Sequence, residues 1–125
     1  MKTIEIYLSA RISADAHEWN NLKAMQESDI GLLLPLYGRD CAWEVGWYAN
    51  SEKLLVVYTE NNTERLRDWM VKGGIDQVIT PTDWLFDVLK NDPILAEKSR
   101  LIESRSKLSD VLVEIYKQSR GDISG

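Results

Sequence analysis

Cysteine and histidine are almost absent from this sequence. Cys41 and His17 are the only residues of their types among 125. One cysteine cannot form a disulfide within a chain, and residues 1–5 lack the apolar stretch of a secretory signal, so we expect a reducing, cytoplasmic environment. Zinc sites are built mainly from cysteine and histidine. We therefore expect no disulfide framework, no metal site and no other cofactor.

Long apolar runs and an excess of positive charge are also missing. The longest apolar run, residues 30–37, contains Gly31 and Pro35 and is far shorter than the roughly 18 residues of a membrane-spanning helix. Fifteen Lys and Arg stand against twenty Asp and Glu, a formal charge of −5, so no broad positive field attracts phosphate backbones. Membrane insertion and binding of duplex nucleic acid are not expected.

Glycine and proline are scarce too, with 7 and 3 residues respectively. Together with 44% apolar and 28% charged residues, this composition is typical of a folded domain and excludes a disordered or fibrous chain. A chain of 125 residues is long enough for one apolar core and too short for two.

The sequence contains an alternation of short apolar runs and amphipathic segments. Strands are predicted over residues 3–8, 30–35, 53–58 and 75–80, and helices over 15–28, 41–51, 63–72 and from 81 onward. The second and third runs are continuously apolar, which is typical of strands buried on both faces. This order predicts an α/β fold, an open parallel sheet of about four strands with helices on both faces.

A seven-residue apolar repeat marks the C-terminal part. One long helix is predicted over residues 94–119, with the repeat at Ile94, Leu101, Leu108 and Ile115. Such a stripe favours packing against a partner chain, in a homodimer or a higher even homo-oligomer. The alternative is a helix lying across its own sheet and fraying at Gly121. The predicted organisation is an α/β domain over 1–92, a C-terminal helix for oligomerisation over 93–120 and a tail over 121–125.

Ligands of open parallel sheets bind at the carboxyl ends of the strands, which places the candidate site in residues 9–13, 35–44 and 59–62. Glu44 falls in the first turn of a helix that begins at such an end, so its carboxylate can face a ligand and act as a nucleophile. The alternative is a glutamate that only complements the positive end of the helix dipole.

The segment around Glu44 resembles the nucleoside 2-deoxyribosyltransferase family. The family motif is Glu-x-Gly-x-Ala between two apolar strands. Here it reads Glu44-Val45-Gly46-Trp47-Tyr48-Ala49, one residue longer, between the strands at 30–34 and 54–57. The resemblance includes Tyr7 and extends over residues 17–78. It implies a flavodoxin-like, Rossmann-like fold and cleavage or transfer of the N-glycosidic bond of a nucleoside or nucleotide. Glu44 would attack the anomeric carbon, and Tyr7 would orient its carboxylate.

Three departures from the family affect the expected site. The family's strand, helix and substrate loop after the first strand are missing, so we expect a pocket that is open or completed by another subunit. Asn21 takes the place of the family's acidic residue and cannot donate a proton as a general acid. Gly38 stands where the family has Asp or Ser, six residues before Glu44; Asp40, four residues before Glu44, either replaces that residue or caps the helix.

The remaining candidate residues are substrate-binding. Ser9, Arg11 and Ser13 follow the first strand, where a 5′-phosphate can bind, and Arg11 is alternatively a surface ion-pairing residue. Trp43 stacks on a base or sugar, or else packs in the core. Two other functions remain open: a non-catalytic nucleotide-binding protein that acts as a sensor or sequesters its ligand, and an NAD glycohydrolase that uses the same carboxylate chemistry.

Overall fold

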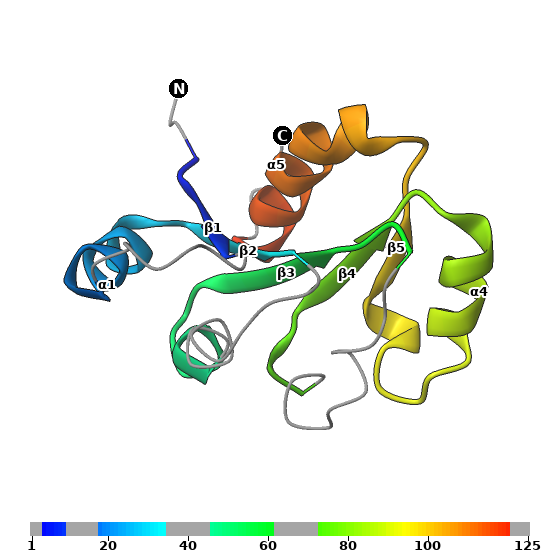
Figure 1. Ribbon diagram of the computed structural model, residues 1–125, viewed down its shortest axis with the longest axis horizontal. Helices are drawn as coiled ribbons and strands as arrows, with labels where there is room; N and C mark the ends of the chain where they lie inside the picture. The colour runs from blue at the N-terminus through cyan, green and yellow to red at the C-terminus, as the bar shows by residue number, and fades with distance from the viewer. Residues whose placement is uncertain (1–3, 10–17, 35–45, 62–72, 121–125) are drawn as a thin grey trace.

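The computed structural model describes residues 4–9, 18–34, 46–61 and 73–120 and contains one parallel sheet (Figure 1). The five strands lie side by side in the order of the sequence: β1 (Ile6–Ser9), β2 (Ile30–Leu33), β3 (Leu54–Tyr58), β4 (Gln77–Thr80) and β5 (Ser99–Leu101). Each strand is parallel to its neighbours. The open parallel sheet of an α/β fold is confirmed, with five strands instead of about four.

Helices lie on both faces of this sheet, as predicted. α1 (Glu18–Glu27), a helical segment at residues 46–49 and α4 (Asp83–Lys90) lie on one face, and α5 (Leu108–Ser119) lies on the other (Figure 1). Two 3-10 turns, η2 (Ala96–Lys98) and η3 (Arg105–Lys107), flank β5. No helix within the described ranges is long and apolar enough to span a membrane.

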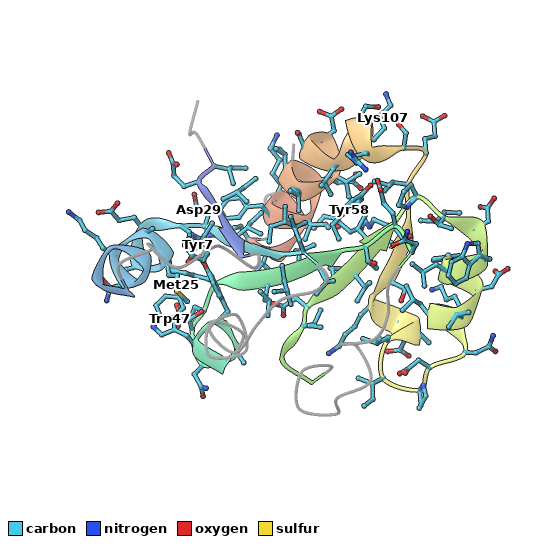
Figure 2. All side chains as sticks on the ribbon, viewed as in Figure 1. Tyr7, Met25, Asp29, Trp47, Tyr58 and Lys107 are labelled. Atoms are coloured by element: carbon cyan, nitrogen blue, oxygen red, sulfur yellow. The ribbon has the colours of Figure 1, made fainter. Side chains whose placement is uncertain are left out.

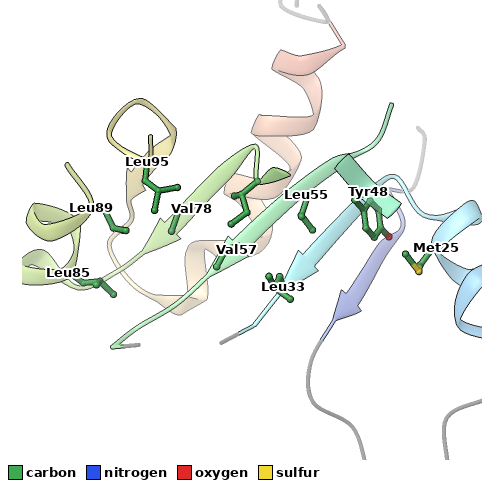
Figure 3. Close-up of a cluster of buried hydrophobic side chains, with 10 residues drawn as sticks. Met25, Leu33, Tyr48, Leu55, Val57, Val78, Leu85, Leu89 and Leu95 are labelled. Atoms are coloured by element: carbon green, nitrogen blue, oxygen red, sulfur yellow. The ribbon is translucent and has the colours of Figure 1, made fainter. Parts of the chain in front are cut away.

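The strands are apolar on both faces because each face has its own cluster of buried side chains. On β3, Leu55 and Val57 point toward Met25 of α1 and Leu85 of α4 (Figure 3). Val56 and Tyr58 point the opposite way, toward Leu112, Ile115 and Tyr116 of α5. A strand residue is therefore buried whichever way it points, which explains the continuous apolar run of the sequence.

The sequential strand order explains why the connecting helices share a face. Crossovers between parallel strands are right-handed, so steps that all run in one direction across the sheet place their helices on one side. α5 follows the last strand and crosses to the other side. The described strands contain no reversal of order, such as the one that forms a ligand crevice in doubly wound sheets. Strand order alone therefore does not position a ligand here.

The long helix predicted over residues 94–119 is wrong in its first half. Residues 99–101 form β5, which pairs with β4, and the α-helix begins only at Leu108. Leu101 of the seven-residue repeat lies in that strand, and Ile115 is buried on α5 against the sheet. β5 joins the sheet of the predicted 1–92 domain, and α5 lies across its own sheet, the alternative arrangement stated above.

Candidate functional site

Few of the predicted site residues fall in the described part of the chain. Tyr7 is half-buried on β1, Ser9 is the last residue of β1 and Asn21 lies in α1. The following predicted site residues lie outside the described residues: Arg11, Ser13, Gly38, Asp40, Trp43 and Glu44. The site is therefore built from the side chains that surround the sequence motif.

An aromatic cluster of Tyr7, Trp47 and Tyr48 lies on the sheet face that carries α1. The Tyr7 and Tyr48 ring centroids are 6.4 Å apart, and Trp47 meets Tyr48 edge-on at 5.0 Å (Figure 2 shows Tyr7 and Trp47). Tyr48 is only 1% exposed. A Cβ atom on Gly31 would lie 2.7 Å from the Tyr48 ring. The ring therefore rests directly on the β2 backbone, at a position that only glycine leaves free.

Hydrogen bonds hold Tyr48 in this place. The Ser28 hydroxyl donates to the Met25 carbonyl oxygen at 2.7 Å, so it accepts from the Tyr48 hydroxyl, also at 2.7 Å. The Lys53 ammonium group donates to the carbonyl oxygen of Ser28. Because Ser28 lies between α1 and β2, these bonds attach Tyr48, near the end of the motif segment (residues 44–49), to the chain that enters the amino end of β2.

A shallow hollow adjoins the same segment. It is lined by Gly46, Trp47, Asn50 and Ser51, which lie where the helical segment leads toward the amino end of β3. None of these lining residues has an ionisable acid or base. The hollow therefore offers hydrogen-bonding groups and an aromatic surface, and its lining residues include no acidic or basic side chain.

A second polar group, the carboxyl-edge cluster, consists of Tyr58, Glu60, Thr82 and Arg105. Arg105 binds Glu60 through two hydrogen bonds, Nε to Oε2 at 2.7 Å and Nη2 to Oε1 at 2.5 Å. The Tyr58 hydroxyl donates to Glu60 Oε2 at 2.6 Å, and the Thr82 hydroxyl donates to the Glu60 carbonyl oxygen at 2.6 Å. The cluster connects the carboxyl ends of β3 and β4 with η3.

The charges of this cluster are fixed over the physiological range. Hydrogen bonds from Arg105, and secondarily from Tyr58, lower the pKa of the Glu60 carboxyl group to about 2. The hydrogen bonds with Glu60 and, secondarily, Tyr58 raise the pKa of Arg105. Burial, and secondarily the hydrogen bond to Glu60, raises the pKa of Tyr58. Glu60 stays ionised and paired, so it is a poor general acid and a poor nucleophile.

Neither protein-family models nor curated proteins nor solved structures match this chain. The candidate site is therefore argued from the residues of this chain alone. The two clusters lie toward opposite ends of the strands: the carboxyl-edge cluster is at the carboxyl ends of β3 and β4, whereas Tyr48 packs on Gly31 and binds Ser28 near the amino end of β2. Within the described ranges no group of three acidic, histidine or cysteine residues is arranged to hold a metal ion.

Sequence reasoning found only part of the carboxyl-edge cluster. Glu60 falls within the predicted site range 59–62, but the helix predicted over residues 94–119 places Arg105 in its interior. The two residues are 45 positions apart, and no local pattern connects them. The only available signal was the position of Glu60 directly after a buried strand.

Proposed function

We propose that this protein cleaves or transfers the N-glycosidic bond of a nucleoside or nucleotide, with Glu44 as the nucleophile. The observation that carries the proposal is the packing of Tyr7 against Tyr48, with ring centroids 6.4 Å apart. Tyr48 follows Glu44 by four residues. The family resemblance expects a tyrosine of the first strand beside the nucleophile, and the contact of Tyr7 with Tyr48, four residues after Glu44, supports this expectation.

The geometry of a helix extends this argument to Glu44. In the helix predicted over residues 41–51, positions four apart share a face and are separated by slightly more than one turn, about 6 Å along the axis. This helix follows β2 and returns to the start of β3, so Glu44 is expected nearer than Tyr48 to the carboxyl ends of the strands. β1 ends there with Ser9. Glu44, Tyr7 and Ser9 are thus expected around one site.

The reaction proceeds in two balanced steps. The Glu44 carboxylate attacks the anomeric carbon, the bond from that carbon to the base nitrogen breaks, and the base leaves with the bonding electrons and takes up a proton. Water or a second base then attacks the same carbon, loses a proton to the solvent and displaces the Glu44 carboxylate. Because Asn21 cannot supply the proton, Asp40 is the candidate donor. Arg11 and Ser13 would hold a 5′-phosphate, and Trp43 would stack on the base.

A second candidate function is nucleotide binding without catalysis. It is favoured by Asn21, which stands where the family resemblance expects the acid. An NAD glycohydrolase is a variant of the main proposal, since the nicotinamide–ribose bond is also an N-glycosidic bond. The same assay distinguishes these candidate functions if its substrate panel includes NAD.

The test is release of free base from nucleosides, 5′-nucleotides and NAD, measured by chromatography for the wild type and for Glu44→Gln. The matched control is Glu52→Gln, which changes an exposed glutamate beside the motif segment. A 2′-fluorinated nucleoside slows breakdown of the glycosyl ester, so the intact mass of the protein should increase by the mass of the sugar only when Glu44 is present.

Base release that persists in Glu52→Gln and is lost in Glu44→Gln supports the enzyme. No release, combined with a nucleotide that raises the melting temperature of both wild type and Glu44→Gln, supports the binding protein. Release that survives in Glu44→Gln with no mass adduct on the wild type would exclude Glu44 as the nucleophile.

A further inference from the structure

We propose that a second copy of this chain pairs with the outer edge of β1, antiparallel to it, and extends the sheet across a twofold axis. β1 is the first strand in the described sheet order, with β2 as its neighbour. Ile6 on this strand is 41% exposed. The inference does not depend on the proposed function.

The backbone groups of β1 that face outward follow from its bonds to β2. The Glu5 carbonyl oxygen accepts from the backbone N–H groups of Asp29 and Ile30, at 2.7 and 3.2 Å, so residue 5 faces β2. Successive residues of a strand direct their N–H and C=O groups to opposite sides. The backbone groups of Ile6 and Leu8 therefore point away from β2.

These groups form a self-complementary edge. When two β1 strands run antiparallel with Tyr7 opposite its symmetry mate, residue 6 of each copy stands opposite residue 8 of the other. Each of the two pairs exchanges both N–H···O=C bonds, as in a regular antiparallel ladder. The flanking pair is Glu5 with Ser9, so no two like charges oppose each other.

The other edge of the sheet does not permit the same pairing. β5 is only three residues long, and Arg100 lies at its centre. A twofold β5 pair would bring two Arg100 residues together, although each already binds Glu114 of its own α5 at 3.3 Å. Charged side chains protect a sheet edge from association, and β1 has none between Ile6 and Ser9. A β1-to-β5 contact would be open-ended and give filaments instead of a dimer.

The pairing also determines what lies next to the aromatic cluster. Tyr7 and its symmetry mate form a pair without backbone hydrogen bonds, the closer type of antiparallel pair. Both tyrosine rings lie on the face that carries the aromatic cluster, so the clusters of the two copies adjoin across the axis. The dimer thereby places the two candidate sites side by side.

The test is sedimentation velocity over two decades of protein concentration for the wild type, Ile6→Lys and Leu101→Lys. The two substitutions are matched, since Ile6 and Leu101 are apolar residues of opposite edge strands with exposures of 41% and 40%. We expect a concentration-dependent wild-type dimer, an unchanged dimer for Leu101→Lys and a dissociation constant at least about tenfold higher for Ile6→Lys.

Hydrogen exchange supplies a second readout that needs no variant. The amide protons of Ile6 and Leu8 should become more protected as protein concentration rises, while the amide of Thr59, which donates to Ile79 inside the sheet, should not change. A wild type that stays monomeric at every concentration overturns the proposal. So does a dimer that Ile6→Lys leaves intact, or a dimer in which protection at Ile6 and Leu8 is independent of concentration.

Discussion

At the scale of single residues, the contact between Gly31 and Tyr48 decides how the motif segment sits on the sheet. The Tyr48 ring occupies the space that a side chain at Gly31 would need, and its hydroxyl group donates a hydrogen bond to the Ser28 hydroxyl. Tyr7, on the neighbouring strand, is paired in register with Gly31 and packs beside the same ring. One glycine thus allows the Tyr48 ring to lie directly on β2, beside Tyr7 of β1.

We predict that Gly31→Ala destabilises the protein by roughly 1–3 kcal/mol, the usual cost of overpacking a core. The new Cβ would lie 2.7 Å from two atoms of a fully buried ring. Gly46→Ala is the control, because in the described part of the chain no atom from outside its own helical turn lies within 4 Å of the added Cβ, and alanine favours a helix by about 1 kcal/mol over glycine. Urea denaturation measures the free energy of unfolding of both variants and of the wild type. Equal stability of Gly31→Ala and wild type would contradict the packing.

At the scale of elements, α5 is tied to the sheet near both ends and along its length. Arg105, just before the helix, binds Glu60 at the end of β3. Tyr116, near its end, donates to Asp29 at 3.4 Å, and Arg100 of β5 contacts Glu114 at 3.3 Å. These links explain why the helix packs against its own chain instead of presenting its apolar stripe to a partner.

The Glu60–Arg105 link should be visible as a pH dependence of stability. The pKa of Glu60 is about 2 in the folded state against an ordinary value of 4.5, so folding favours the ionised form. Its contribution is complete above about pH 4.5 and is lost as pH falls toward 2. The difference in free energy of unfolding between wild type and Glu60→Gln should therefore shrink over that window.

Urea denaturation at a series of pH values measures this difference, and Glu97→Gln, at an exposed glutamate of η2, is the control. Because the pair is solvent-accessible, added salt should reduce the difference at neutral pH as well. A difference that stays constant from pH 6 to pH 2.5 would show that the ion pair does not contribute to stability.

At the scale of the whole molecule, the two faces of the sheet are covered unequally. α1, the segment at 46–49 and α4 share one face, whereas α5 is the one described helix on the other. The core of that second face depends on few helical side chains, of which Leu112 is 2% exposed.

Leu112→Ala should accordingly lower the free energy of unfolding by about 2–5 kcal/mol, the range for a large-to-small change in a core. Since the packing is within one chain, the loss should be the same at every protein concentration. Thermal unfolding at several concentrations tests this, with Ser109→Ala on the exposed side of α5 as control. A loss that grows with dilution would mean that Leu112 packs against a partner chain.

The amino-acid sequence by itself determined four strands, their parallel arrangement and the helices α1 and α4, whereas the helix predicted over residues 63–72 lies outside the described residues. Runs such as Leu54–Tyr58 are long enough and apolar enough to show a strand buried on both faces. It also predicts Tyr7 as a site residue, a prediction that stays open, and in the structure Tyr7 packs against Tyr48. Local periodicity carries this kind of information, because it depends only on neighbouring residues.

Only the tertiary structure decided the rest. Residues 99–101, with the sequence Ser-Arg-Leu, are too short and too polar to show a strand, and they become one because β4 offers a free edge. Glu60 with Arg105 and Gly31 with Tyr48 are contacts between residues far apart in the chain. Such contacts leave no local pattern, because the partner that gives each residue its role is brought beside it only by folding.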